Sequence, residues 1–181
     1  MYYSTNYTSP MGNITLASHQ NKLVGVWIEG QKYFGDMAVK KWQEQANLAI
    51  FNQTKHWLDD YFAGKNPAIN QLPLAPKGTP FRYLVWDILC KIPYGQLITY
   101  GDIAKQIASA LNKQQMSSQA VGGAVGHNPI SIIIPCHRVI GTNGNLTGYA
   151  GGIDKKIKLL QIEGVDTSNL TLPRQPNTPE K

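Results

Sequence analysis

Cysteine is scarce in this chain, and its scarcity excludes two classes of protein. Only two cysteines, Cys90 and Cys136, occur among 181 residues. Two thiols cannot form the disulfide framework of a small secreted domain, and neither is spaced with histidines as zinc ligands are. No metal site and no cofactor is therefore expected. Reduced thiols are typical of the cytosol, so a cytoplasmic location is the expectation.

Long apolar runs and strong charge are also missing. No apolar stretch reaches the ~20 residues of a membrane-spanning helix, so no membrane partner is expected. Residues 1–6 lack the basic and apolar regions of a signal peptide. Residues 1–78 hold 7 Lys/Arg and 5 Asp/Glu, and residues 79–181 hold 10 and 6, which together give a net charge of +6. This modest excess is compatible with a nucleic-acid partner but does not require one. Nothing indicates an obligate protein partner.

The first part of the chain alternates apolar and polar residues between turn signals. This pattern predicts strands at residues 2–7, 14–17 and 23–28, and a longer apolar periodicity predicts a helix at 46–63. A proline-rich linker follows and ends near residue 76. Residues 1–76 are thus predicted to form a small antiparallel sheet with one helix.

The second part is predicted to be mainly helical. Thr79-Pro80 is a helix start, and the apolar face of that helix includes Leu84 and ends beside Cys90, which is interpreted as structural. Thr99-Tyr100-Gly101-Asp102 fits a capping box. A polar turn then separates this helix from a second one at 118–126, which Ser117 can cap, as in a helix-turn-helix. The predicted fold class is α/β in the broad sense, more narrowly α+β, with residues 77–166 as the second domain and 167–181 as a mobile tail.

Two glycines lie inside the predicted second helix of this motif. Each of Gly122 and Gly123 costs roughly 1 kcal/mol against alanine in a helix interior. Glycine at such a place permits the close approach of another backbone. That backbone could belong to a packed element of the protein or to nucleic acid, and the sequence favours neither.

The most unusual stretch is residues 132–140, Ile-Ile-Ile-Pro-Cys-His-Arg-Val-Ile. Its β-branched residues predict buried, extended chain, which Pro135 interrupts just before Cys136. A thiolate is the reactive form of cysteine, and His137 could be the base and Arg138 the positive charge that favour it. Alternatively, a lone cysteine is a small buried hydrophobic residue, and neighbours on an extended chain point to opposite faces.

The segments around this stretch carry a family resemblance. From about residue 79 to 164, the chain resembles the alkylguanine–DNA alkyltransferases, also called methylated-DNA–protein-cysteine methyltransferases. The matching segments, in order, are Ile92-Pro93-Tyr94-Gly95, Thr99-Tyr100-Gly101-Asp102-Ile103-Ala104, Ala120-Val121-Gly122-Gly123-Ala124, Asn128-Pro129 with Pro135-Cys136-His137-Arg138-Val139, and Tyr149-Ala150-Gly151-Gly152. The first domain is similar mainly in layout.

The resemblance implies DNA repair by a single-turnover transfer. Cys136 would take a methyl or other alkyl group from the exocyclic oxygen of alkylated guanine in double-stranded DNA. His137 would remove the thiol proton through a water molecule, Glu163 would orient His137, and Asn128 would tie the preceding turn to the reactive loop. In this family the partner is the damaged duplex, and the protein is not regenerated.

The resemblance also implies residues that bind the base and the DNA. Tyr100 would donate to the guanine ring, Val139 would meet the base's amine through its carbonyl, and Pro135, Tyr149 and Ala150 would border the pocket. The base must leave the duplex to be reached. The helix at 118–126 would achieve this with Ser118, Gln119, Ala120 and Gly122 against the DNA.

This chain departs from the family pattern at three places. The position that usually holds an intercalating arginine is Gln119, Ala150 replaces a serine of some relatives, and the zinc ligands of some first domains are absent. Two other functions compete: a helix-turn-helix DNA-binding regulator without catalysis, and a thiol hydrolase. The regulator would not need Cys136, and the hydrolase would turn over repeatedly.

Overall fold

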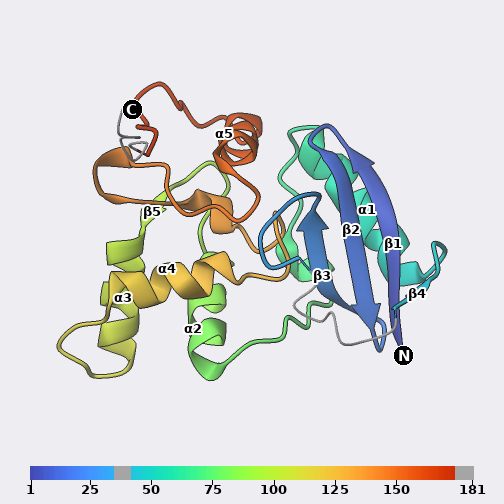
Figure 1. Cartoon of the computed structure of the whole chain (residues 1–181), viewed down its shortest axis with the longest axis horizontal. Coiled ribbons are helices and arrows are strands. Elements are labelled where there is room, and N and C mark those ends of the chain that lie inside the picture. The colour runs from blue at the N-terminus through green and yellow to red at the C-terminus, as the bar shows by residue number, and fades with distance from the viewer. Residues whose placement is uncertain (35–41, 174–181) are drawn as a thin grey trace, which may run out of the picture.

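The computed structural model describes residues 1–34 and 42–173, and it places the two halves of the chain side by side (Figure 1). The N-terminal half is a four-stranded sheet of β1 (Tyr2–Ser9), β2 (Gly12–His19), β3 (Lys22–Ile28) and β4 (Trp42–Glu44) in the order β3-β2-β1-β4. β1, β2 and β3 are antiparallel, as predicted, and β4 is an additional strand parallel to β1. The α+β class is confirmed.

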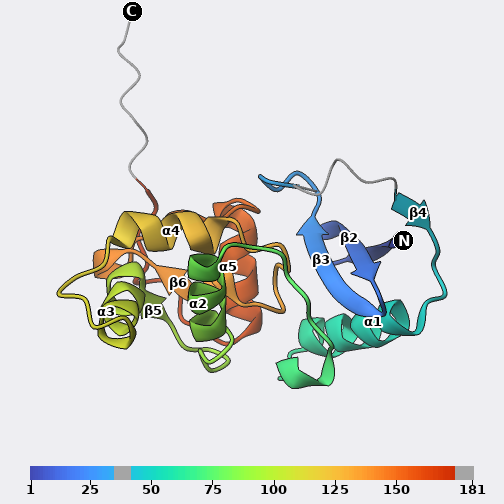
Figure 2. The same ribbon diagram turned by 90° about the horizontal axis from the view of Figure 1, so that it is seen from below.

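Local sequence explains the hairpins of this sheet. Gly12 has a φ of +101°, a conformation that side chains disfavour, and it begins β2 after the Ser9 turn. Gln20 and Asn21 both have positive φ, which is the signature of the two-residue turn that matches strand twist. Helix α1 (Ala49–Phe62) lies along one face of the sheet (Figure 2) and buries Phe51 and Leu58 completely.

The C-terminal half is mainly helical, as predicted. It contains α2 (Pro80–Leu89), α3 (Tyr100–Ala110), α4 (Ser118–Gly126) and α5 (Ile153–Ile162), together with a parallel pair of two-residue strands, β5 (Ile98–Thr99) and β6 (Val139–Ile140). Within residues 1–34 and 42–173, three short 3₁₀ turns complete the fold: η1 (Ile69–Gln71), η2 (Cys136–Arg138) and η3 (Thr142–Gly144). Among the described residues, no helix has both the length and the apolar character needed to cross a membrane.

Side-chain caps begin three of these helices where the sequence predicts them. The hydroxyl oxygens of Thr79, Thr99 and Ser117 each accept a hydrogen bond from the backbone N–H three residues later. On α2, however, Leu84 is 37% exposed, and Trp86 packs inward instead. The Trp86 indole N–H donates to the carbonyl of Ala124 at 2.9 Å, which fixes α2 against α4.

One apolar core joins the two halves of the molecule. It includes side chains from the sheet, from α1, from the C-terminal helices and from the segment before Cys136. β3 contributes to this junction through its backbone: Val26 N–H donates to Pro129 O at 2.9 Å, and Ser131 N–H donates to Val26 O at 3.0 Å. The N-terminal sheet therefore supports the reactive stretch directly. The predicted division at residue 76 remains a prediction.

The isoleucines before Cys136 are buried as predicted, but the prediction of extended chain is wrong. Ile132 has a φ of +72°, which is rare for a β-branched residue, and Ile134 N–H bonds to Ile130 O at 3.0 Å to close a turn. The local preference of isoleucine for extended chain is overridden here, because the Asn128 side chain forms hydrogen bonds with the backbone at both ends of the turn and stabilises it.

Part of the predicted mobile tail is attached to the body. Leu146 N–H donates to Thr171 O at 2.8 Å, and Thr171 N–H donates to Gly144 O at 3.0 Å. Leu170 also packs beside Ile140 and Leu160. Residues 167–173 therefore form a strap across the loop that follows β6, and residues 174–181 lie outside the described residues.

Candidate active site

The reactive stretch folds as a single 3₁₀ turn, η2, between Pro135 and β6. Successive side chains on such a turn diverge by about 120°, so Cys136, His137 and Arg138 reach three different surroundings. The Cys136 side chain is almost fully buried, with the residue 5% exposed, and His137 is 0% exposed. The expectation that neighbours on extended chain diverge by half a turn therefore does not apply.

Asn128 holds the thiol and the turn together. Its amide nitrogen lies 3.2 Å from Cys136 Sγ and donates to Ile134 O at 2.7 Å, while its amide oxygen accepts from Ile130 N–H at 3.0 Å. These bonds join Asn128 to both ends of the turn and to the thiol. The N–H near Sγ also favours a thiolate, because a donor stabilises the charged form.

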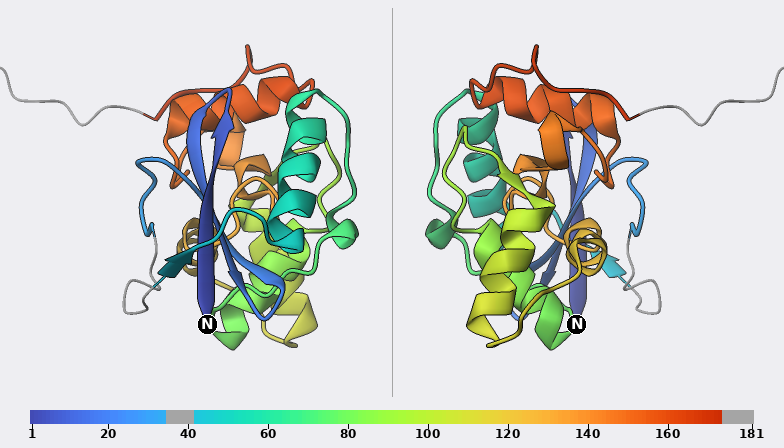
Figure 3. Two further views of the ribbon diagram at one scale, coloured as in Figure 1. Left: turned by 90° about the vertical axis from the view of Figure 1, so that its right-hand side faces the viewer. Right: turned by 90° about the vertical axis from the view of Figure 1, so that its left-hand side faces the viewer.

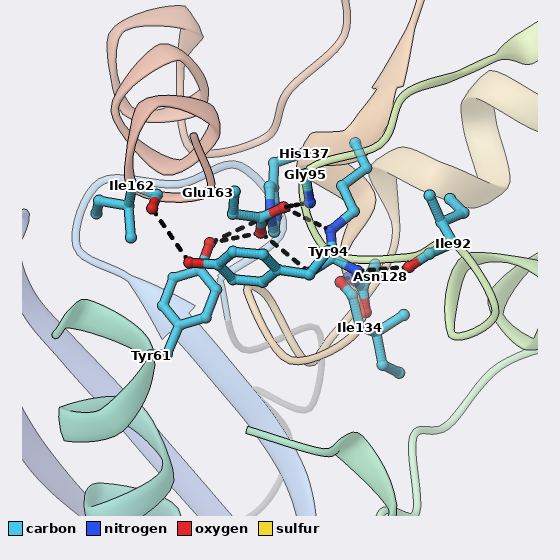
Figure 4. A network of polar contacts seen from close by, with 10 residues as sticks. Tyr61, Ile92, Tyr94, Gly95, Asn128, Ile134, His137, Ile162 and Glu163 are labelled. Atoms are coloured by element: carbon cyan, nitrogen blue, oxygen red, sulfur yellow. Dashed lines mark hydrogen bonds and ion pairs between the residues drawn. The ribbon is translucent and has the colours of Figure 1, made fainter. Parts of the chain in front are cut away.

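A buried carboxylate organises the other side of the turn (Figure 4). Glu163 Oε1 lies 2.6 Å from His137 Nε2, and Arg138 donates to both carboxylate oxygens, from Nε at 2.8 Å and from Nη2 at 3.0 Å. Gly95 N–H and the Tyr61 hydroxyl add further donors at 3.0 and 2.8 Å. The sequence predicts the contact between Glu163 and His137 only through the resemblance, and the structure has it.

The protonation states follow from this cluster of donors. Burial alone would raise the pKa of Glu163, but the hydrogen bonds and charges of His137 and Arg138 lower it to about 2, so the carboxylate is ionised. Burial lowers the pKa of His137 below its ordinary value despite the pull of Glu163. A neutral imidazole facing a carboxylate donates from Nε2, which leaves the lone pair on Nδ1. Among the described residues, no group bonds to that Nδ1 atom.

The positive charge that acts on the thiol is Lys156, not Arg138. Burial raises the pKa of Cys136, and Asn128 and Lys156 oppose that rise. Arg138 is instead occupied by Glu163 and by the carbonyl of Ile92, to which its Nη1 donates at 2.6 Å. Lys156 is 0% exposed, and its ammonium donates to the carbonyls of Val139 and Thr147. Because Cys136 remains a thiol near neutral pH, a base is needed to activate it.

An open groove of about 650 Å³ lies between α4 and residues 147–152. Gly122 lines it on one side, and Tyr149 and Ala150 on the other. Tyr100 contacts two of the lining residues: its hydroxyl donates to Thr147 O at 3.0 Å, and its ring lies 3.9 Å from the place of a Cβ at Gly122. Tyr100 and Tyr149 both interact electrostatically with Cys136. Burial raises the pKa of Tyr100 to about 12, so this phenol keeps its proton and can donate it in a hydrogen bond.

Helix α4 presents its small residues to the outside. Ser118, Gln119 and Ala120 are exposed. A methyl group added at Gly123 would meet no atom within 4 Å, and one at Gly122 would only touch the Tyr100 ring at 3.9 Å. Packing within the protein therefore does not account for either glycine.

Comparison with protein families identifies the chain. Residues 1–76 match the model described as "6-O-methylguanine DNA methyltransferase, ribonuclease-like domain", and residues 80–165 match "6-O-methylguanine DNA methyltransferase, DNA binding domain". This chain belongs to the 6-O-methylguanine DNA methyltransferase family. The family resemblance carried by the reactive stretch is thereby confirmed.

Similar proteins support the same assignment. Proteins named methylated-DNA–protein-cysteine methyltransferase include one from Haemophilus influenzae, 39% identical over 90% of this chain and 87% of that protein, and one from Methanosarcina acetivorans, 44% identical over 91% and 99%. The crystal structure of Mycobacterium tuberculosis OGT in complex with DNA superposes with a TM-score of 0.80 at 40% identity, covering 90% of this chain and 93% of that one.

Within this methyltransferase fold, sequence reasoning missed two buried polar residues. Lys156 lies three positions after Ile153 and four before Leu160, so helical periodicity placed it on the inner face of α5. Tyr61 likewise follows Leu58 by three positions on the inner face of α1, where its pattern is that of an ordinary core residue. A charged residue inside an apolar stripe was the available signal for Lys156, whereas Tyr61 had none.

Proposed function

We propose that this chain repairs DNA by moving a methyl or other alkyl group from the exocyclic oxygen of alkylated guanine to the sulfur of Cys136. The observation that carries the proposal is the arrangement at η2: a buried thiol held by Asn128, next to an imidazole whose other nitrogen is bound by an ionised Glu163. A cysteine that only packs needs neither group. The family membership supplies the substrate class.

The chemistry is a single displacement. Cys136 Sγ attacks the alkyl carbon, a sulfur–carbon bond forms, and the bond between that carbon and the guanine oxygen breaks with its electron pair on the guanine. The thiol proton passes to Nδ1 of His137 through a water molecule, and Glu163 stabilises the imidazolium, as the third member of a triad does. The guanine takes up a proton and is restored. The resulting thioether is inert, so each molecule acts once.

Residues in and near the groove can stabilise the guanine as it leaves. Negative charge develops on the guanine as the bond breaks, and preorganised donors stabilise such charge. Tyr100 supplies a hydroxyl once it exchanges its bond to Thr147 for one to the guanine ring. Val139 offers the second lone pair of its carbonyl to the guanine amine, beside Lys156. Pro135, Tyr149 and Ala150 border the base, and the loss of a hydroxyl at Ala150 matters little if its backbone N–H makes the contact.

Double-stranded DNA carrying alkylated guanine is the partner. A base inside the stack cannot reach a buried thiol, so the nucleotide must rotate out of the duplex. Gly122 lines the groove, and Ser118, Gln119 and Ala120 are exposed on the same helix, so α4 would contact the duplex as this happens. The proposal includes a cytoplasmic location, since the acceptor works only as a reduced thiol.

Counting methyl groups transferred per protein tests the proposal. The full chain is mixed with excess duplex containing O6-methylguanine, and the methyl label on protein is measured by peptide mass mapping. We expect one methyl group per molecule, located on the Cys136 peptide and absent from the Cys90 peptide. Burial raises the pKa of Cys90 to about 11, so that thiol stays protonated at neutral pH.

Matched variants distinguish the competing functions. Cys136→Ser should transfer nothing while still binding DNA, and Cys90→Ser should transfer one methyl group as before. No transfer by the unaltered chain would favour the DNA-binding regulator. Repeated turnover on esters or peptides would favour the thiol hydrolase.

A further inference from the structure

We propose that Tyr61, supplied by α1 of the N-terminal half, is a positioning residue of the alkyl-transfer site, whose hydroxyl holds the Glu163 carboxylate and the His137 imidazole in their working arrangement. This inference rests on the proposed function and deepens it. It assigns to the N-terminal half a direct part in the chemistry, through a residue 102 positions away from Glu163.

The geometry ties Tyr61 to both partners at once. Its hydroxyl donates to Glu163 Oε1 at 2.8 Å and lies 3.3 Å from His137 Nε2. Figure 4 shows the ring rising from α1 to meet these two side chains, and Figure 3 shows the ends of α1 and α5 meeting at one corner of the molecule. Tyr61 is 1% exposed, so water does not compete for this bond.

The Tyr61 ring is itself held in place. The indole of Trp57 stacks on it with centroids 5.6 Å apart, and the rings of Phe62 and Tyr94 meet it edge-on at 5.5 and 6.2 Å. Three aromatic side chains thus fix the direction of one hydroxyl. Mere filling of this space would need only a phenylalanine, because the hydroxyl contacts only Glu163 and His137 in the described part of the chain and the other contacts belong to the ring.

The hydroxyl can act only as a donor to the carboxylate. Burial and the negative charge of Glu163 raise the pKa of Tyr61 far above its ordinary value, so the phenol stays protonated. Glu163 Oε1 therefore receives bonds from Tyr61, from His137 Nε2 and from Arg138 Nη2, while Oε2 receives Arg138 Nε and Gly95 N–H. All of these donors interact with the single negative charge of the Glu163 carboxylate.

This sharing sets how strongly His137 holds a second proton. Glu163 favours the imidazolium, whereas Arg138 from the same turn and Lys156 from α5 disfavour it. Cys136 lies next to it in the chain, and Tyr61 faces it from α1. A donor that withdraws charge from Oε1 weakens the pull of Glu163 on the imidazolium. Removing the Tyr61 hydroxyl should therefore raise the pKa of His137, and Oε1 should also become freer to turn away from Nε2.

The test compares Tyr61→Phe with Tyr94→Phe in the full chain. Both substitutions remove one phenol oxygen from the same aromatic cluster, but the Tyr94 hydroxyl donates to the carbonyl of Ile162 rather than to Glu163. Single-turnover methyl transfer is measured against pH, with O6-methylguanine both in duplex DNA and as the free base. Thermal unfolding of each variant verifies that it is folded.

In Tyr61→Phe, we expect the acid limb of the rate profile to shift to higher pH by about half to one unit. A shift of this size corresponds to the loss of one hydrogen bond to a charged partner. The rate on the plateau should fall about three- to tenfold, equally for duplex and free base, because DNA binding is not involved. Tyr94→Phe should leave the limb where it is. An unmoved limb in Tyr61→Phe, or an equal shift in both variants, would overturn the inference.

A second measurement does not depend on transfer. Nitrogen chemical shifts of the His137 ring, followed by NMR across the same pH range, report its pKa and its tautomer directly. A raised pKa in Tyr61→Phe supports the inference, and an unchanged pKa and tautomer refute it. Failure of the unaltered chain to methylate Cys136 would refute the proposed function alone, and the two failures are therefore distinguishable.

Discussion

At the scale of single residues, charge around η2 is divided between two sides. Glu163 lies on the side of His137 and Arg138, and Lys156 lies on the side of the thiol. The two sides have different roles. The Glu163 carboxylate orients His137 as the base, and the Lys156 ammonium stabilises the thiolate of Cys136. Both depend on burial, because low local polarity strengthens each interaction.

Replacing Lys156 by methionine should slow the reaction at the thiol. Methionine keeps the length of the side chain but removes the charge that opposes the rise in the pKa of Cys136. Burial lowers the pKa of Lys156 to about 8, so at pH 7 the amine is mostly charged and this help is present; it is lost as the pH rises through about 8. We expect single-turnover transfer at pH 7 to fall roughly tenfold, equivalent to a change of about one pKa unit.

Lys158→Met is the matched control for this prediction. Lys158 is on the same helix but is exposed. Its variant should react at the unaltered rate. The pH dependence of Cys136 alkylation by iodoacetamide should shift upward only in Lys156→Met. An identical profile in both variants would mean that Lys156 serves only to bind the Val139 and Thr147 carbonyls.

His137 and Glu163 should behave as a unit. If Glu163 acts by orienting His137, then His137→Ala and Glu163→Gln should each slow transfer, and the double variant should be little slower than His137→Ala alone. The measurement is the single-turnover rate of all three variants, with folding verified by thermal unfolding. Losses that multiply in the double variant would show that the two side chains act independently.

At the scale of elements, α4 combines poor helix formers with an open outer surface. Gly123→Ala should raise the free energy of unfolding by about 0.5–1 kcal/mol, because alanine favours a helix and its methyl group meets no neighbour. The same methyl group should keep the helix backbone from the duplex and weaken DNA binding several-fold. Urea unfolding and titration with a labelled duplex measure the two effects.

Asn52→Ala on α1 provides the comparison. Asn52 is exposed in the other half of the molecule, and alanine improves the helix there too. It should stabilise the protein without changing DNA affinity. Equal affinity of Gly123→Ala and the unaltered chain would indicate that α4 does not approach DNA at Gly123.

Substitution of the exposed Gln119 tests whether this side chain fills the gap that a flipped base leaves in the duplex. Glutamine there can offer only neutral hydrogen bonds, worth roughly 0.5–1.5 kcal/mol, whereas arginine offers charge-assisted ones of roughly 1.5–3 kcal/mol. We expect Gln119→Arg to speed repair of duplex DNA about fivefold, as a difference of about 1 kcal/mol gives. Repair of the free base should be unchanged, because nothing needs flipping. Equal gains on both substrates would place the flipping function elsewhere, for example at His127.

At the scale of the whole molecule, the net charge of +6 indicates how DNA is held. The exposed residues of α4 are small and carry few groups that could distinguish bases, so phosphate contacts should supply most of the affinity. Dissociation constants for unrelated duplexes should agree within about tenfold and should rise together with salt, with a log–log slope of about +3 to +5 if three to five phosphates are contacted. A strong preference for one undamaged sequence would favour a regulator instead.

Much of the fold could be predicted because its signals are local. The antiparallel hairpins and the capped starts of α2, α3 and α4 all depend on residues a few positions apart. The parallel strand β4 could not be predicted in this way, since its three residues owe their conformation to pairing with β1. The strap at 167–173 is similar: few apolar residues suggest mobility, yet bonds to Gly144 and Leu146 hold it.

The sequence by itself determined the order of the antiparallel strands and the main helices, the reactive Pro-Cys-His-Arg stretch and the family, because periodicity, caps and motifs are properties of neighbouring residues. Only the tertiary structure decided which cation faces the thiol, how Ile132 turns, why α4 tolerates two glycines and where the Tyr61 hydroxyl points. Each of these depends on burial and on partners that lie far away in the chain. Burial changes pKa values and leaves polar atoms in need of partners, and which atoms meet inside the core is settled only when the two halves pack together.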